Sequence, residues 1–274
     1  MREDVPRVRP LGLGAKLDEA IWLFRDHFRL YFGIMLFAAL PVGLLYGLAE
    51  DGAKLYFTLT AGERFPPWGA MEGLALEVEI LIAAVFSGVE LIAVRPFHSA
   101  AVIMATSAVC LGARPGAAAC ARRAMARYGR FFTANLLFLA LLALGFMLCI
   151  APGILFMLFC YVYLHVVVLE DGPLIGSLGR AKELMYGSKG AVFILTVLSF
   201  LLHDAVMAVQ LLIPPGFGGA VLAGAASAFH WTFVAVLSTV VYFSARARLE
   251  HLDLDLRVAR IDGDGGDEGA APVL

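Results

Sequence analysis

The chain has 274 residues, of which 61% are hydrophobic and only 16% are charged, and its mean hydropathy is +0.83. A soluble globular domain is typically about 45–50% apolar and about 25% charged, so this composition excludes a chain built around one buried core in water. The formal net charge of −2 gives no overall attraction to nucleic acid, and we expect no nucleic-acid partner.

The apolar residues are gathered in runs of roughly 20, the length at which a helix crosses about 30 Å of hydrocarbon. Such a run must be helical in lipid, because each backbone N–H and C=O then finds its partner within the segment. We therefore predict an all-α, polytopic membrane protein with about six transmembrane helices. The predicted spans, in chain order, are residues 30–48, 74–111, 131–150, 154–169, 191–213 and 221–243.

The first span follows a polar, charged segment and has no small-residue cleavage site, so we expect it to be retained and not removed as a signal peptide. The second region would measure about 57 Å as one helix of about 38 residues. Either Pro96 kinks one tilted helix that projects beyond the membrane, or two shorter segments are present. We favour the single helix, because the basic residues then fall on one side. The later pairs Pro152-Gly153 and Pro215-Gly216 fit tight turns at a membrane face.

The basic residues predict the orientation. If the N-terminus is cytoplasmic, 18 of the 21 lysines and arginines fall on the cytoplasmic side, Lys54 and Arg64 fall outside, and Arg95 lies within a span. By the positive-inside rule this distribution predicts six spans with both ends in the cytoplasm. A seven-span arrangement would place at least one basic connection on the wrong side.

Three stretches before odd-numbered spans resemble one another, at residues 14–33, 116–135 and 176–195. Each offers a short amphipathic helix with basic residues and then enters a span. A threefold repeat of interfacial helix, span out and span back would explain the pattern, although similar boundary chemistry would also produce it. We expect one transmembrane domain over 14–260, a cytoplasmic tail at 1–13 and a disordered Gly/Asp-rich tail at 261–274.

Two groups of charged residues are expected at the cytoplasmic face. Arg123, Arg127 and Arg130 recur at i, i+4 and i+7, so they share a helical face. With Arg122 they would meet anionic lipid headgroups, at about 1 kcal/mol per basic residue; ordinary topology-setting charge is the plainer alternative. The second group is an expected ion-pair network between the fourth-to-fifth connection and the end of the sixth span, or a headgroup pocket made from the same arginines. Its members are Glu170, Arg180, Glu183, Arg246, Arg248 and Glu250.

Several polar residues fall inside the predicted spans, where a charge at mid-bilayer costs about 2.5–3.5 kcal/mol and is a functional hypothesis by default. A buried Asp204–Arg95 or Glu90–Arg95 pair would neutralise that cost. A bound or transported solute and a shallower depth are the alternatives. The candidates are Glu90, Arg95, His98, His165 and Asp204, with His203 and His230 as further polar positions.

Motifs of catalysis and metal binding are missing from the sequence: there is no P-loop, no GxSxG, no HExxH and no dinucleotide fingerprint. His203 and Asp204 alone make no metal site, because neighbouring side chains on a helix point about 100° apart. Cys110, Cys120, Cys149 and Cys160 show no CxxC spacing and are expected to be small buried hydrophobes. We predict no catalytic residue, metal or cofactor. Small residues over 218–228 favour close helix packing, within the chain or between protomers.

A family resemblance is carried by four segments. They read APGI at 151–154, VVVLED at 166–171, SLGRAKELMYG at 177–187 and YFSARARLEHLDL at 242–254. Over about 14–260 the chain resembles bacterial multi-span proteins similar to the membrane domain found beside some glycerophosphoryl diester phosphodiesterases. Ala181 and Ala245 stand where that pattern usually has Ser and Asp. The resemblance implies fold and localisation, and it carries over no phosphodiesterase activity, because no soluble domain accompanies the spans.

The expected function is that of a non-enzymatic inner-membrane protein that organises or contacts membrane lipids or partner proteins, with homo-oligomers possible in principle. The alternative is a small-solute transporter or channel that uses Glu90, Arg95 and Asp204 along a path between spans. An intramembrane enzyme would require acidic or histidine side chains to converge on one cavity, and the spacing shows no such convergence.

Overall fold

The computed structural model describes residues 8–61, 68–210, 212 and 217–256, and within these it is helical without strands. The prediction of an all-α membrane-spanning fold is confirmed. The predicted tail at 261–274 and residues 1–7 of the N-terminal tail lie outside the described residues. The helices are α1 (Leu13–Asp26), α2 (Phe28–Ala61), α3 (Trp68–Val89), the π-helical turn η1 (Glu90–Val94), α4 (Arg95–Cys110), α5 (Ala117–Ala126), α6 (Tyr128–Leu148), α7 (Ile150–Phe159), α8 (Tyr163–Leu169), α9 (Leu174–Met185), α10 (Lys189–Gln210) and α11 (Phe217–Glu250).

Five helical segments of the described chain are long and apolar enough to cross a membrane. A sixth is added if the two parts of α2, which bend by 43° around Pro41, are counted as one span. The five segments are Ile80–Cys110, Tyr128–Leu148, Ile150–Leu169, Lys189–Val209 and Val221–Glu250.

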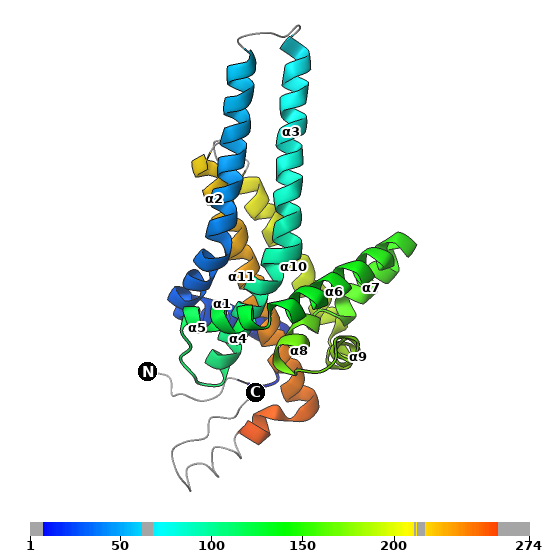
Figure 1. Ribbon diagram of the computed structural model, residues 1–274. Helices are drawn as coiled ribbons and strands as arrows, with labels where there is room; N and C mark the ends of the chain where they lie inside the picture. The colour runs from blue at the N-terminus through cyan, green and yellow to red at the C-terminus, as the bar shows by residue number, and fades with distance from the viewer. Residues whose placement is uncertain (1–7, 62–67, 211, 213–216, 257–274) are drawn as a thin grey trace.

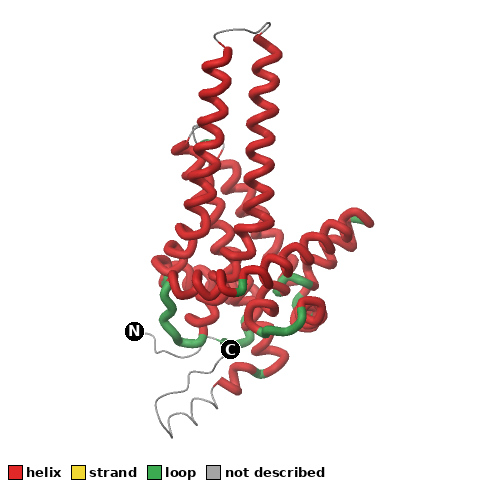
Figure 2. Tube along the Cα trace, viewed as in Figure 1, coloured by secondary structure: helices red, strands yellow, loops and turns green. Residues whose placement is uncertain are grey.

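The helices gather unequally along the bundle (Figure 1). Helices α2 and α3 run side by side and extend beyond the others at one end, while α6 and α7 form a hairpin that runs obliquely to them. At the opposite end lie α1, α5, α8, α9 and the last turns of α11, and the loops at 111–116 and 170–173 are found there as well (Figure 2). We call this end the basic end, because most of the arginines discussed above are on it.

Residues 68–110 form one continuous helical run, and no break separates α3 from α4. The run widens at η1, where the N–H of Arg95 bonds to the carbonyl of Glu90. Pro96 has no N–H to offer to the carbonyls behind it. Two side chains of α6 donate hydrogen bonds to carbonyls of this turn instead. Asn135 donates to the carbonyl of Leu91 at 3.0 Å, and Tyr128 donates to the carbonyl of Ala93 at 2.9 Å. The π turn therefore lets the helix continue through Pro96, and its carbonyls connect the long helix to α6.

The turn between the third and fourth spans is placed differently from the prediction. The chain reverses at Cys149, whose backbone is extended, and Pro152 lies in the first turn of α7, where proline is tolerated. A Cβ added to Gly145 would lie 3.1 Å from Cα of Gly153, so glycine is needed for this close approach. Cys149 is exposed, which corrects the expectation that all four cysteines are buried. The Pro215-Gly216 turn lies outside the described residues.

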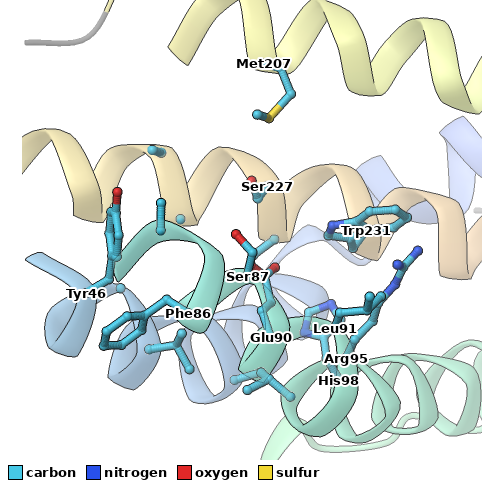
Figure 3. Close-up of a pocket in the computed structure, with 18 of the residues that line it drawn as sticks. Tyr46, Phe86, Ser87, Glu90, Leu91, Arg95, His98, Met207, Ser227 and Trp231 are labelled. Carbon is cyan, nitrogen blue, oxygen red and sulfur yellow. The ribbon is translucent and has the colours of Figure 1, made fainter. Parts of the chain in front are cut away.

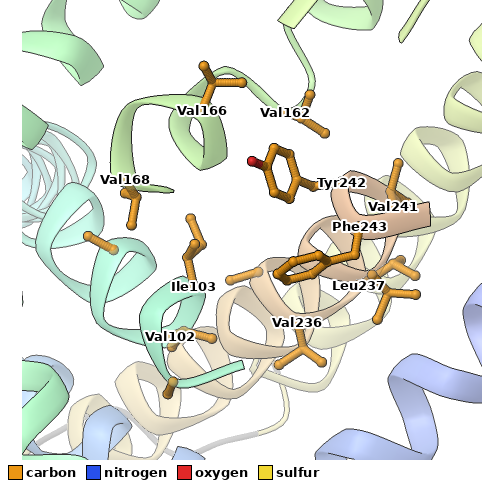
Figure 4. Close-up of a cluster of buried hydrophobic side chains, with 14 of the residues drawn as sticks. Val102, Ile103, Val162, Val166, Val168, Val236, Leu237, Val241, Tyr242 and Phe243 are labelled. Carbon is orange, nitrogen blue, oxygen red and sulfur yellow. The ribbon is translucent and has the colours of Figure 1, made fainter. Parts of the chain in front are cut away.

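The buried core lies between α4, α8 and α11 (Figure 4). Val102 and Ile103 from α4 meet Val166 from α8 and Leu237 from α11, and all four side chains are almost fully buried. Close approach also occurs between α2 and α11, where a Cβ on Gly224 would lie 3.7 Å from Cα of Gly43. Gly224, one of the small residues of the sixth span, thus packs within the chain, whereas Gly218 and Ala225 are exposed.

The short helices α1, α5 and α9 occur where the sequence predicts amphipathic segments. Each buries one face against the bundle: Leu23 of α1, Ala124 of α5 and Leu184 of α9 are fully buried. The threefold repeat itself stays a prediction.

Candidate functional site

A cavity of about 460 Å³ lies between α2, the α3–η1–α4 run, α10 and α11. We call it the charged cavity, because its lining includes Glu90 and Arg95. Figure 3 shows Arg95 beside Trp231 at one end and Tyr46 at the other. The remaining lining is mostly apolar or small. It consists of Ala38, Val42, Gly43, Ala83, Phe86, Ser87, Leu91, Val94, His98, His203, Met207, Ala223, Gly224, Ser227 and Ala228.

The long helix supplies the charged residues from one face. The cavity is bordered by residues of this helix at alternating intervals of three and one: Ser87, Glu90, Leu91, Val94, Arg95 and His98. The π turn lies between Glu90 and Arg95, and π turns inside α-helices are frequent at functional sites. The structure therefore brings three of the predicted intramembrane residues, Glu90, Arg95 and His98, into one cavity.

Arg95 does not form the ion pair that the sequence suggested. Neither Glu90 nor Asp204 comes within 4.0 Å of its guanidinium among the described ion pairs. The guanidinium lies instead over the indole of Trp231, with Cζ 3.3 Å from the ring centroid. Stacking satisfies the face of the cation and leaves its N–H edges available. His98 is fixed separately, because its Nε2 lies 2.9 Å from Oγ1 of Thr232.

The charged cavity opens on the surface between α3 and α10. Ser87 on α3 is exposed, and Leu91 and Met207, which border the same cavity from η1 and α10, are 37% and 45% exposed. Helix α10 packs against α11 and α7, and α3 packs against α2. Both walls belong to helical segments that are long and apolar enough to cross a membrane.

Asp204 is excluded from this site. It is exposed on α10 and does not border the charged cavity, although its neighbour His203 does. Adjacent residues of a helix point in directions about 100° apart, so one position can line a cavity while the next faces outward. The prediction of an Asp204–Arg95 pair is wrong for this reason.

A second cavity of about 350 Å³ lies between α6, α7, α8, α10, α11 and the start of α4. We call it the neutral cavity, because Arg95 is its one charged lining residue in the described structure. It shares Leu91, Arg95, His203 and Trp231 with the charged cavity, so these side chains separate the two spaces. His165, predicted as an intramembrane candidate, lines the neutral cavity, and its Nε2 lies 3.2 Å from the hydroxyls of Thr239 and Ser238.

The second predicted group of charged residues meets at the basic end. Arg180 of α9 contacts Glu170 through Nε at 3.0 Å, contacts Glu250 of α11, and lies 3.9 Å from Glu183. Arg246 contacts Glu250 at 2.8 Å. This network joins the connection before α9 to the end of α11.

Two further contacts extend the network at its edges. Tyr242, which was not predicted as a member of the network, donates a 2.7 Å hydrogen bond to Glu170. Arg248 lies apart and donates to the carbonyl of Tyr186 at 3.0 Å. Helix α1 packs against α11, and burial there, followed by the charge of Arg248, lowers the pKa of Lys16.

The arginines predicted on one helical face are divided. Arg127 and Arg130 bond to Asp171 at 2.7 and 3.2 Å, so they hold the loop after α8. Arg122 and Arg123 of α5 are exposed and have no ion-pair partner among the described residues. Helix α5 ends at Ala126, and the helix turn at Arg127 breaks the regular spacing on which the shared face depended.

The described residues contain no group of three histidine, cysteine, aspartate or glutamate side chains placed to hold a metal ion. Comparison of the chain with family models, with curated proteins and with solved structures finds no match. The resemblance to the membrane domain of glycerophosphoryl diester phosphodiesterases therefore stays a prediction that rests on the four sequence segments.

Proposed function

We propose that this membrane-spanning protein is non-enzymatic and binds a phospholipid, with the headgroup in the charged cavity and the acyl chains between α3 and α10. One observation carries the proposal: Glu90 and Arg95 border the same cavity, and no ion pair of 4.0 Å or less joins them among the described residues. Opposite charges inside a span that lack a direct ion pair are costly unless a ligand also compensates them. Under the positive-inside rule the basic end faces the cytoplasm of a bacterial inner membrane.

The chemistry of the two side chains indicates the class of headgroup. A guanidinium donates several hydrogen bonds in a plane and suits phosphate oxygens, and stacking on Trp231 fixes the direction of that plane. A carboxylate only accepts hydrogen bonds, so Glu90 suits an ammonium group. A headgroup that carries both groups, as in an aminophospholipid such as phosphatidylethanolamine, matches both residues.

Lipid retention tests the proposal. Native mass spectrometry of the protein released from nanodiscs is expected to show preferential retention of phosphatidylethanolamine over phosphatidylglycerol. Arg95→Gln should weaken retention of both lipids about tenfold or more, because a charge-assisted hydrogen bond contributes about 1.5–3 kcal/mol and 1.4 kcal/mol is a factor of ten. Glu90→Gln should remove only the preference for phosphatidylethanolamine.

Asp204→Asn is the matched control, because it removes a charge from α10 outside the cavity. It should retain lipid as the unmodified protein does. Equal retention by the protein, Arg95→Gln and Asp204→Asn would overturn the proposal.

The exposed pair Arg122 and Arg123 supports a second, peripheral contact with anionic lipid at the basic end. A peptide of residues 114–130 is expected to bind phosphatidylglycerol vesicles and not phosphatidylcholine vesicles. Replacing both arginines by glutamine should weaken partitioning about 30-fold, from about 1 kcal/mol per basic residue. Partitioning that is independent of lipid charge would count against this contact.

Small-solute transport is the second candidate function. It is favoured by the position of the two cavities, which meet at Arg95, His203 and Trp231. Side chains and not backbone therefore separate the two spaces. Transport would require these side chains to move and water to enter the neutral cavity.

A further inference from the structure

The neutral cavity is bordered by a concentration of unpartnered polar atoms. Eight described side-chain nitrogen or oxygen atoms are buried without a hydrogen-bond partner, and six of them belong to residues that line this cavity. The six are the hydroxyls of Tyr161, Tyr163 and Thr196 and the Nδ1 atoms of His165, His203 and His230.

Six unpartnered polar atoms beside one cavity are unusual, because buried polar groups in folded proteins nearly always have hydrogen-bond partners. Each unmade hydrogen bond costs a desolvation penalty, and six together would take a large share of the stability of a typical domain. The six side chains come from α8, α10 and α11 and the turn before α8, and the cavity is the space that they have in common.

We infer that the neutral cavity holds water when the protein is in the membrane, and that this water hydrogen-bonds the six atoms. A phenol, a threonine hydroxyl and a neutral imidazole can each donate or accept, as a water molecule requires. A volume of about 350 Å³ accommodates about ten waters at about 30 Å³ each. Acidic side chains are missing from the described lining, which does not suit a metal cation.

Water in the neutral cavity would also hydrate Arg95, which borders this cavity as well as the charged cavity. The wall between the cavities is a stack of rings, with His203 and Trp231 centroids 5.5 Å apart and His230 and Trp231 centroids 4.8 Å apart. Arg95 lies on the indole at 3.3 Å and borders both cavities. The guanidinium therefore contacts the water of the neutral cavity on one side and the charged cavity on the other, which a cation inside a span requires.

Radiolytic hydroxyl-radical labelling of the unmodified protein in nanodiscs tests the inference, because water activated inside a cavity oxidises the side chains beside it. Tyr163 is 2% exposed and lines the neutral cavity, whereas Tyr31 and Tyr242 are equally buried but line neither cavity and have hydroxyl partners. We expect Tyr163 to be oxidised several-fold faster than Tyr31 and Tyr242. Equal rates for the three tyrosines would overturn the inference.

A cavity-filling variant provides the second measurement. Ser199 lines the neutral cavity and donates only to the carbonyl of Leu195 in its own helix, so Ser199→Leu removes no contact between helices. Because the larger side chain displaces part of the water, we expect the oxidation rate of Tyr163 in this variant to fall below its rate in the unmodified protein, while the rate of Tyr31 stays unchanged. A small molecule other than lipid that stays bound in native mass spectrometry, together with slow oxidation of Tyr163, would show a different occupant and overturn the inference. Neither result depends on lipid in the charged cavity, so the two proposals fail separately.

Discussion

Replacement of Arg180 by alanine is expected to lower the free energy of unfolding by about 2–3 kcal/mol, because charge-assisted hydrogen bonds to two carboxylates are lost together. Arg180 holds Glu170 at 3.0 Å and also contacts Glu250, so it connects two segments far apart in the sequence. The three side chains are 20–31% exposed. The loss should therefore be smaller than the 3–5 kcal/mol typical of a fully buried pair.

Unfolding by sodium dodecyl sulfate in mixed micelles measures this effect. Arg122→Ala is the matched control, because Arg122 is exposed and unpaired among the described residues, and its replacement should change the free energy by less than about 0.5 kcal/mol. Similar stabilities of the two variants would show that the network at the basic end contributes nothing to folding.

Phe24→Ala is expected to cost about 3–4 kcal/mol, through the loss of buried area and the space left behind. Phe24 attaches α1 to the bundle: its ring centroid lies 4.9 Å from that of Phe229 and 5.9 Å from that of Phe233 on α11, and 5.6 Å from that of Tyr31 on α2. An interfacial helix that rested on lipid alone would lose much less, because its apolar face would remain in an apolar medium.

Phe37→Ala removes the same side chain from a position on α2 that is 64% exposed to the surroundings. Its cost in the same unfolding experiment should stay below about 1 kcal/mol. Equal costs for Phe24→Ala and Phe37→Ala would contradict the docking of α1 on α11.

The membrane-spanning helices were largely predictable, because the length and polarity of a segment decide whether it can cross hydrocarbon. The same is true of α1, α5 and α9, whose buried and exposed faces follow the helical period. Hydropathy could not place the reversal at Cys149, because a proline-glycine pair fits a turn and also fits the first turn of a helix.

The sequence identified charged residues of the candidate site, but it did not predict which side chains those residues contact. Glu90 and Arg95 stand out as charges in an apolar run, but the sequence does not show the π turn that places these two positions on one face, nor the position of Trp231 on another helix. Asp204 shows the same limit. Hydropathy estimates how deep a residue lies, whereas the direction of its side chain around the helix axis depends on which helices pack beside it.

The neutral cavity was signalled in the sequence only by its histidines, His165, His203 and His230, which stand out as polar residues inside predicted spans. Tyr161, Tyr163 and Thr196 are ordinary residues of apolar helices, and only their common position beside one cavity distinguishes them. The network at the basic end is intermediate: its charges were selected from the sequence, but Tyr242 joins it through a hydroxyl that no charge pattern identifies.

A cryo-electron microscopy structure of the protein in nanodiscs of phosphatidylethanolamine and phosphatidylglycerol would test the central claim most directly. We expect density for a headgroup between Glu90 and Arg95, with its acyl chains leaving between α3 and α10 and with Arg95 still on Trp231. A closed gap between α3 and α10, with Glu90 and Arg95 paired directly and no lipid between them, would contradict it.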